Sequence, residues 1–364
     1  MHLYARLAWS CAFALALCGQ ALAAEAQPPV QVALVGCAHI HTPSFIALLK
    51  SRADVKIKCV WDHETARARK YAGETGAAVV DDVGKVWGDP DIQTVLILSE
   101  TDRHEELVLA AAKARKHLFV EKPLGLGAKD AYAMMQAVEA AGVIFQMGYT
   151  QRGEGRFLFL KEQLAAGTLG RITRVRAVTA HAGALEGMFD KDFKWVTDFN
   201  QSGVGGMGDI GTHSLDLLLL LMGEVEQVTA AVTPGTARYG CDEAGEGLIR
   251  FKNGVVGTFA GSWVAASNPI TLQVCGTEGS VVFMHDYVYF QSNKVEGATG
   301  KRPHAKLPKS LPNVLELFID AVQGKPDVPL VKIREAAYCS AVMEALYQSV
   351  KENKWVAPPL PPDK

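Results

Sequence analysis

The stretch VQVALVGCAHIHTPSFIALLKSRADVKIKCVWD, residues 30–62, decides the fold of this 364-residue chain. Its first apolar strand ends at Gly36, a helix is predicted over residues 42–52, and a second apolar strand ends at Asp62. The alternation continues with a helix over residues 64–73, the strand TVLILS at 94–99, a helix over 103–114 and the strand HLFVEKP. This pattern predicts a parallel, doubly wound sheet with helices on both faces, in which ligands bind at the carboxyl ends of the strands.

The loop after the first strand is where a dinucleotide-binding (Rossmann) domain, predicted over residues 28–150, would hold a pyrophosphate. The usual fingerprint is G-x-G-x-x-G, whose glycines allow a tight turn, close approach of the phosphates and close helix packing. Here the loop reads GCAHIH, so Gly36 takes the first position, Ala38 the second and His41 the third. One glycine of three makes this loop the least orthodox part of the domain.

The carboxylate at the end of the second strand, Asp62, either belongs to a turn or accepts hydrogen bonds from the ribose hydroxyls of a nucleotide. We therefore predict NAD as the cofactor, while Arg67 and Arg69 leave NADP open. His39 and His41 have the H-x-H spacing of metal ligands, but the sequence shows no third ligand. No metal site is predicted, and both histidines are expected to contact the nucleotide or solvent.

After residue 150 the pattern changes to strands, and we predict an α+β domain over residues 151–364 with an open, mainly antiparallel sheet. Asn253-Gly254 and Glu278-Gly279 are hairpin-type turns between alternating runs. The segment IREAAYCSAVMEALYQSVKEN predicts a closing helix, which is expected to pack back toward the N-terminal domain.

The first 24 residues read as a Sec-type signal peptide, with Arg6 ahead of an apolar stretch and small residues at Ala21 and Ala23. They predict an exported, periplasmic protein that is not inserted in the membrane once the signal is cleaved.

The net charge is −2 and no basic block stands out, so no nucleic-acid partner is expected. Five cysteines follow the predicted signal peptide. They are scattered and odd in number, and they are expected to be mostly buried thiols: Cys37, Cys59, Cys241, Cys275 and Cys339.

Five segments resemble the Gfo/Idh/MocA family of oxidoreductases, in the family's order: FVEKPLGLG, LAAGTLGRI, GVGGMGDIGTHSLDLLLLLMG, VCGTEGSVVF and the closing helix. The most specific pieces are the motif at residues 121–123 and Asp209-x3-His213, whereas the phosphate loop departs from the family pattern at Ala38 and His41. The resemblance implies a Rossmann domain followed by an α+β domain whose open sheet mediates homo-oligomers. It also implies an NAD(P)-dependent oxidoreductase that acts on a secondary hydroxyl of a carbohydrate substrate: a sugar, cyclitol or glycoside.

Asp209, His213 and Asp216 are spaced i, i+4 and i+7, so they project from one face of a helix. The resemblance implies that His213 is the general base for a sugar hydroxyl and that Asp209 holds the substrate. It implies that Lys122 polarises the reacting oxygen or relays its proton. Asp216 is expected to contact these side chains and not the substrate. Taken singly, Asp209 is equally compatible with a helix N-cap, His213 with a core histidine and Lys122 with a surface lysine.

The remaining site candidates form two groups. Cofactor contacts are expected from Gly36, Ala38, His39, Ile40, Asp62, Ser99, His104, Glu121 and Lys122. Substrate contacts are expected from Tyr149, Arg152, His181, Trp195, Asp209 and His213.

Three functions remain open: a dehydrogenase, a redox-neutral enzyme that keeps its NAD through a keto-sugar cycle or a sugar-to-sugar hydride transfer, and a non-catalytic sugar sensor. Lys122, Asp209 and His213 argue against the sensor, because a pure binder needs no proton relay. Export favours the redox-neutral enzyme, because a periplasmic dehydrogenase has no metabolic pool of nucleotide to draw on.

Overall fold

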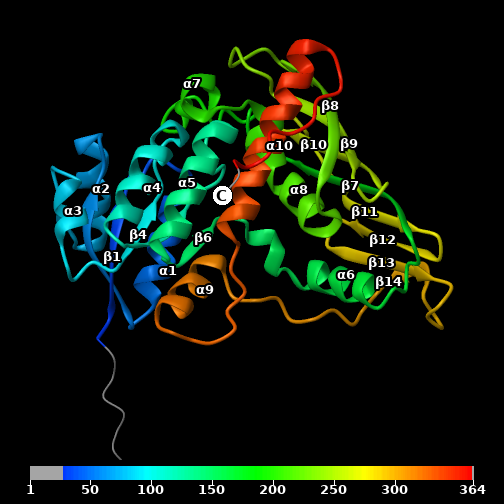
Figure 1. Cartoon of the computed structure of the whole chain (residues 1–364), viewed down its shortest axis with the longest axis horizontal. Coiled ribbons are helices and arrows are strands. Elements are labelled where there is room, and N and C mark those ends of the chain that lie inside the picture. The colour runs from blue at the N-terminus through cyan, green and yellow to red at the C-terminus, as the bar shows by residue number, and fades with distance from the viewer. Residues whose placement is uncertain (1–27, 363–364) are drawn as a thin grey trace, which may run out of the picture.

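The computed structural model describes residues 28–362, so the expected signal peptide lies outside the described residues. The described part contains two sheets, and helix α10 (Ile333–Glu352) runs between them (Figure 1). No helix of this part combines the length and the apolar character needed to cross a membrane. Within it the five cysteines are free, and three of them are buried.

The first sheet has six parallel strands in the order β3-β2-β1-β4-β5-β6. They are β1 (Val30–Val35), β2 (Val55–Trp61), β3 (Ala78–Val79), β4 (Thr94–Ile97), β5 (His117–Val120) and β6 (Phe145–Met147). The order reverses between β1 and β4, and dinucleotides bind outside the carboxyl ends of strands at such a point. The predicted doubly wound fold is confirmed.

Helices cover both faces of this sheet, which is why β1 and β4 are almost continuously apolar. One face carries α1 (Thr42–Ser51), α2 (Thr65–Thr75) and α9 (Val314–Val322). The other carries α3 (Gly84–Gly88), α4 (His104–Lys113) and α5 (Ala128–Ala141).

Helix α9 lies within the predicted second domain but packs on the first sheet. Its side chains Leu315 and Phe318 belong to the same buried cluster as Leu34 and Phe119. Helix α10 also returns toward the first domain, because Glu344 on α10 accepts a hydrogen bond from the backbone N–H of Ala128 at the start of α5. Residue 150 therefore separates the two sheets but not all the helices that pack on them.

The second sheet has eight strands in the order β14-β13-β12-β11-β7-β10-β9-β8. They are β7 (Ile172–Ala180), β8 (Val225–Thr233), β9 (Ala244–Phe251), β10 (Val256–Ser262), β11 (Ile270–Gly276), β12 (Gly279–Met284), β13 (Tyr287–Ser292) and β14 (Thr299–Pro303). Every pair is antiparallel except β7 with β10, which is parallel, so the predicted mainly antiparallel sheet is confirmed. The hairpins predicted at 253–254 and 278–279 join β9 to β10 and β11 to β12.

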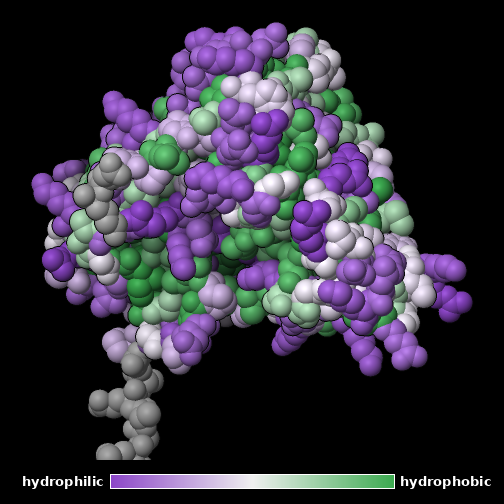
Figure 2. Space-filling model, turned by 45° about the vertical axis from the view of Figure 1, so that its right-hand side comes forward, coloured by the Kyte–Doolittle hydropathy of each residue, from purple (hydrophilic) through white to green (hydrophobic). Residues whose placement is uncertain are grey.

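Helices α6 (Gly155–Ala165) and α8 (Gly206–Met222) pack on one face of the second sheet, and the short helix α7 (Phe199–Ser202) precedes α8 (Figure 1). Hydrophilic side chains cover much of the molecule, with apolar surface between them toward the middle of the view in Figure 2. The axis of α8 is set by its contact with β10 and α10, and this places the first turn of α8 opposite the end of β5.

Candidate active site

Lys122 and Asp209 form the centre of the site. Lys122 follows β5, and its Nζ lies 2.8 Å from Oδ1 of Asp209 in the first turn of α8. The other carboxylate oxygen, Oδ2, accepts a hydrogen bond of 3.0 Å from the indole N–H of Trp263. Burial alone would raise the pKa of Asp209, but the Lys122 ammonium and these hydrogen bonds lower it to about 2. Asp209 is therefore an ionised partner that positions the ammonium of Lys122.

His213 lies one helical turn after Asp209 and is 8% exposed. Its Nδ1 is buried and has no hydrogen-bond partner among the described residues, and the ring of Tyr149 stands edge-on to it at 6.1 Å. Burial, assisted by the Lys122 ammonium, lowers the pKa of His213 to about 3. A neutral imidazole whose buried nitrogen lacks a partner can form a hydrogen bond with a ligand.

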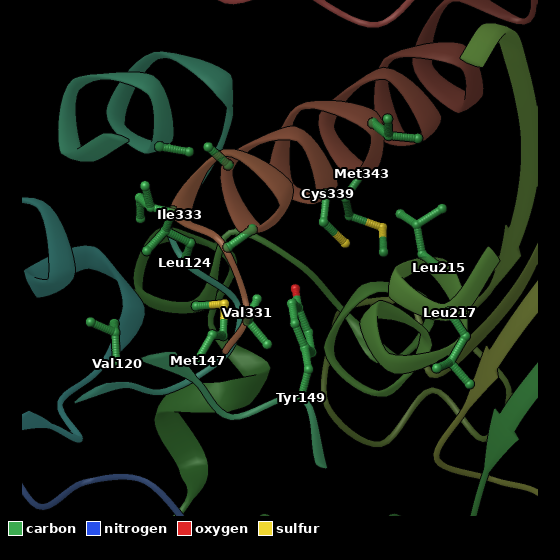
Figure 3. Close-up of a cluster of buried hydrophobic side chains, with 14 of the residues drawn as sticks. Val120, Leu124, Met147, Tyr149, Leu215, Leu217, Val331, Ile333, Cys339 and Met343 are labelled. Atoms are coloured by element: carbon green, nitrogen blue, oxygen red, sulfur yellow. The ribbon is translucent and has the colours of Figure 1, made fainter. Parts of the chain in front are cut away.

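Tyr149 forms part of the wall and does not offer a free polar group to a substrate. It is buried, and its hydroxyl lies 3.1 Å from Oγ1 of Thr212. Figure 3 shows its ring among apolar side chains, with the hydroxyl pointing toward α10 and Cys339. The predicted contact is therefore limited to the ring that faces His213.

The loop after β1 has the tight turn that a nucleotide site needs. Gly36 has a φ of +77°, and a Cβ there would lie 2.5 Å from the Cβ of Ser99, so only glycine fits. The backbone carbonyl of Ala38 accepts a hydrogen bond of 3.2 Å from the indole of Trp195 in the second domain. The loop then leads into α1 at the carboxyl end of the sheet, where the residues present fit a dinucleotide.

Asp62 does not have the free carboxylate that the sequence predicts. Its two oxygens accept hydrogen bonds from the backbone N–H groups of Cys37 and Glu64, at 2.7 and 2.8 Å, and two more from the guanidinium of Arg67. Arg67 in turn reaches Glu100 at 2.8 Å. The expected ribose contact stays a prediction, and it requires Arg67 to move away from Asp62.

Glu121 is fully buried, and its expected contact with the cofactor stays a prediction. The backbone N–H of Lys122 donates to Oε2 at 2.9 Å, His41 Nδ1 lies 3.0 Å from Oε1, and His39 Nε2 lies 3.6 Å from Oε2. The sequence shows no third group beside the H-x-H pair, yet the fold supplies Glu121 from 80 residues away. These three ligand-type residues lie together, as the groups of a metal site would.

Two further predicted contacts are committed to other partners. Arg152 does not join the Lys122–Asp209 pair, because Asp216 and Glu335 hold its guanidinium. His104 is buried, and its ring nitrogens lie against the backbone carbonyls of Ser99, Pro123 and Leu124. His104 therefore supports the segment after Lys122 from behind.

The other candidates lie around the loop and the pair. Trp195 has its ring 6.5 Å from the ring of His39, and the side chain of Ile40 is exposed. His181 Nδ1 accepts a hydrogen bond from Gly183, and burial lowers the pKa of His181. Trp263, which the sequence analysis missed, is the residue that orients Asp209; its only signal is its place at the end of a strand.

Two glycines on either side of Asp209 allow α8 to pack closely. A Cβ on Gly206 would lie 2.4 Å from the carbonyl oxygen of Glu243, and one on Gly211 would lie 3.1 Å from Phe259. Their absence of side chains lets α8 sit directly on the second sheet, and this carries Asp209 and His213 to the site.

Comparison with known families matches both halves of the chain. Residues 30–149 match the model described as an oxidoreductase family with an NAD-binding Rossmann fold. Residues 157–282 match the GFO/IDH/MocA C-terminal domain. The first segment contains all six strands of the first sheet, and the second runs from α6 into β12 of the second sheet.

Several characterised proteins are similar to this chain. The scyllo-inositol 2-dehydrogenase (NAD(+)) of Bacillus subtilis is 30% identical over 68% of this chain and 72% of its own. The levoglucosan dehydrogenase of Pseudarthrobacter phenanthrenivorans and the 1,5-anhydro-D-fructose reductase of Ensifer adhaerens are each 29% identical, over 60% and 59% of this chain. These two alignments span 61% and 64% of the relatives, less than two thirds of their length.

The fold is shared with solved structures. A levoglucosan dehydrogenase in complex with NADH and levoglucosan superposes with a TM-score of 0.76, covering 91% of this chain and 100% of that chain at 23% identity. This likeness extends over both sheets, whereas identity at that level supports the fold alone.

Proposed function

The chain belongs to the Gfo/Idh/MocA family of oxidoreductases, and on this premise we propose that it transfers a hydride between a nicotinamide nucleotide and a secondary alcohol of a sugar, cyclitol or glycoside. The observation that carries the proposal is the Lys122–Asp209 ion pair beside the neutral His213, whose Nδ1 has no hydrogen-bond partner in the part of the chain that the structure describes. The names of the similar proteins support it, because they are dehydrogenases and a reductase of such substrates.

The proposed roles follow from charge. A bound nicotinamide supplies the hydride acceptor or donor. The ammonium of Lys122, held by Asp209, stabilises negative charge that develops on the substrate oxygen. His213 accepts the hydroxyl proton. Burial and, after it, the Lys122 ammonium lower the pKa of His213, and negative charge that develops on the substrate oxygen offsets the second of these causes.

Turnover on a set of substrates tests this proposal. The purified protein is incubated with NAD⁺ or NADP⁺ and with inositols, anhydrosugars, free sugars and glycosides, and reduced nicotinamide is followed by absorbance. We expect reduction with at least one member of the set. The assignment would be contradicted if the protein binds nucleotide but catalyses hydride transfer, in either direction, with no member of the set.

A second candidate, a redox-neutral cycle with retained NAD, is favoured by the position of Trp195. This side chain extends from the second domain onto the phosphate loop, where its indole donates to the carbonyl of Ala38. A nucleotide held beneath Trp195 would leave slowly. Retention would suit an exported enzyme, which we propose to act in the periplasm, where no nucleotide pool exists.

Nucleotide content distinguishes the two candidates. The mature protein is purified from the periplasm, denatured and assayed for released NAD and NADP, and turnover on glycosides is then measured with no nucleotide added. Retained NAD and turnover without addition support the second candidate. Protein that contains no nucleotide when purified and consumes added NAD stoichiometrically supports the simple dehydrogenase instead.

We also propose that the chain forms a homo-oligomer through the face of the second sheet opposite α6 and α8. In Figure 1 the helices beside this sheet lie on one side only, and the other face is formed by side chains such as Leu248, Val282 and Tyr289, all partly exposed. Light scattering at micromolar concentration should give the mass of a dimer or tetramer. A monomeric mass would contradict the proposal.

A further inference from the structure

We propose that His39, His41 and Glu121 form a binding site for a divalent transition-metal ion, for which zinc is the best fit. The set combines two imidazoles and one carboxylate, the ligand types that zinc takes in sites that keep an open position. The inference is independent of hydride transfer, because it concerns an ion that the loop would bind with or without substrate.

The spacing of the ligand atoms supports the site. One ligand atom from each residue can be chosen so that all three lie within 4.8 Å of one another. His41 Nδ1 is 3.0 Å and His39 Nε2 is 3.6 Å from the carboxylate oxygens of Glu121. Two ligands that each lie about 2.1 Å from one tetrahedral ion are separated by about 3.4 Å. Small side-chain shifts therefore bring the three groups onto a common centre.

The local charge also favours a cation. Glu121 is fully buried, and the ammonium of the adjacent Lys122 is paired with Asp209 at 2.8 Å. Besides the two histidines, Glu121 receives the backbone N–H of Lys122. A buried carboxylate is costly unless it is paired or binds a metal. An ion at this point would supply a full positive charge beside the carboxylate.

His39 and His41 are suited to different positions around the ion. His39 is 4% exposed, whereas the side chain of His41 is 38% exposed, so entry and any open coordination position lie on the side of His41. For His39 to bind through Nε2, its Nδ1 must carry the proton, and it then loses the 3.3 Å contact with the backbone N–H of His41. That contact is long for a hydrogen bond, so little stability is lost.

The position of the site suggests what the ion would do. It would lie in the loop after β1, where His41 stands at the third glycine position of the fingerprint, and next to Lys122. An open position there would bind an oxygen ligand, either a phosphate of a nucleotide or the reacting oxygen of a sugar. In both cases the ion acts as a Lewis acid.

Metal content and affinity test the proposal in the full mature chain. Protein stripped with a chelator is titrated with Zn²⁺ in competition with a chromophoric chelator, and bound metal is counted by mass spectrometry. We expect one ion per chain, and about 100-fold weaker binding or more in His39→Asn, His41→Gln and Glu121→Gln. Substitution with Co²⁺ should give visible absorption bands of a low-coordinate site, and titration with phosphate should perturb them if the open position takes a phosphate oxygen.

His63→Asn is the matched control, because His63 also lies beside two carboxylates, 3.5 Å from Asp62 and 3.7 Å from Glu100, but is not part of the cluster. We expect it to bind zinc as the unmodified chain does. Circular dichroism in the presence of chelator shows whether each variant is folded, and His41→Gln changes a partly exposed side chain. The proposal is overturned if the unmodified chain binds no stoichiometric ion, or if folded His41→Gln binds it equally well.

Discussion

At the scale of single residues, the sequence could identify the residues of the site but not the partners that each side chain contacts. Lys122, Asp209 and His213 carry the resemblance in the sequence. The fold places Lys122 against Asp209, and within residues 28–362 it leaves Nδ1 of His213 without a hydrogen-bond partner. The sequence did not reveal that Trp263 occupies the second oxygen of Asp209 or that Arg67 covers Asp62, because both contacts join segments far apart or depend on rotamers.

Removal of either proton-handling side chain will abolish most turnover. Lys122→Ala and His213→Ala should fold, bind nucleotide and lose about 10²–10⁴-fold in kcat/KM, the usual effect of removing a general acid or base. The measurement is steady-state kinetics on a substrate found in the screen, with nucleotide binding followed by fluorescence. Lys129→Ala, an exposed lysine on α5, is the control. Near-normal rates in both site variants would contradict the assignment of Lys122 and His213 to proton transfer.

Arg67 should influence the choice between NAD and NADP. It is the cation beside the expected ribose position, and it occupies Asp62 with two hydrogen bonds. Arg67→Ala frees the carboxylate for the ribose hydroxyls and removes a partner for a 2′-phosphate, so the preference for NAD over NADP should rise by about tenfold. Isothermal titration with both nucleotides measures this ratio. An unchanged ratio would show that Arg67 neither blocks the ribose hydroxyls at Asp62 nor binds a 2′-phosphate.

At the scale of elements, helices and strands with clear periodicity were predicted, and their docking was not. Helix α9 had a local signal, because Asn313 and Glu316 form a capping box. That it packs on the first sheet depends on contacts with β5 and β6, which no local pattern contains. The glycines of α8 are visible in the sequence, but the groups that Gly206 and Gly211 approach, Glu243 and β10, lie further along the chain.

Gly261 tests the packing of α8 on β10. A Cβ at this position would lie 2.3 Å from the carbonyl oxygen of Met207 and 2.8 Å from the amide of Gly211, so backbone atoms must move. Gly261→Ala should lower the free energy of unfolding by about 1–3 kcal/mol. The matched control is Gly73→Ala, in α2 with no atom within 4 Å, which should be neutral or stabilising. Equal stability of the two variants in urea would contradict the close packing.

At the scale of the whole molecule, three histidines are buried in or beside the site. Burial lowers the pKa of His39 and of His213 to about 3, and it also lowers the pKa of His104. In the unfolded chain a histidine has a pKa of about 6.5. As the pH falls below 6.5, the unfolded chain therefore binds protons that the folded chain does not, and stability is lost.

This linkage predicts that stability falls on acidification before the carboxylates titrate. Between pH 6.5 and pH 5 each such histidine contributes up to about 1.4 kcal/mol per pH unit. His213→Asn lacks one of these groups, so its free energy of unfolding should fall less steeply than that of the unmodified chain. Urea titrations at pH 7, 6 and 5 measure both slopes; equal slopes would show that His213 is protonated in the folded protein.

Hydride transfer at this site is tested most directly by following the hydrogen itself. A substrate from the screen, labelled with deuterium at the reacting carbon, is mixed with the protein and oxidised nucleotide, and the mass of the nicotinamide is measured after a single turnover. We expect the deuterium to appear on the reduced nicotinamide in the unmodified chain, and to do so far more slowly in His213→Ala. Deuterium that is lost to water, or that stays on the sugar while the product forms, would contradict it.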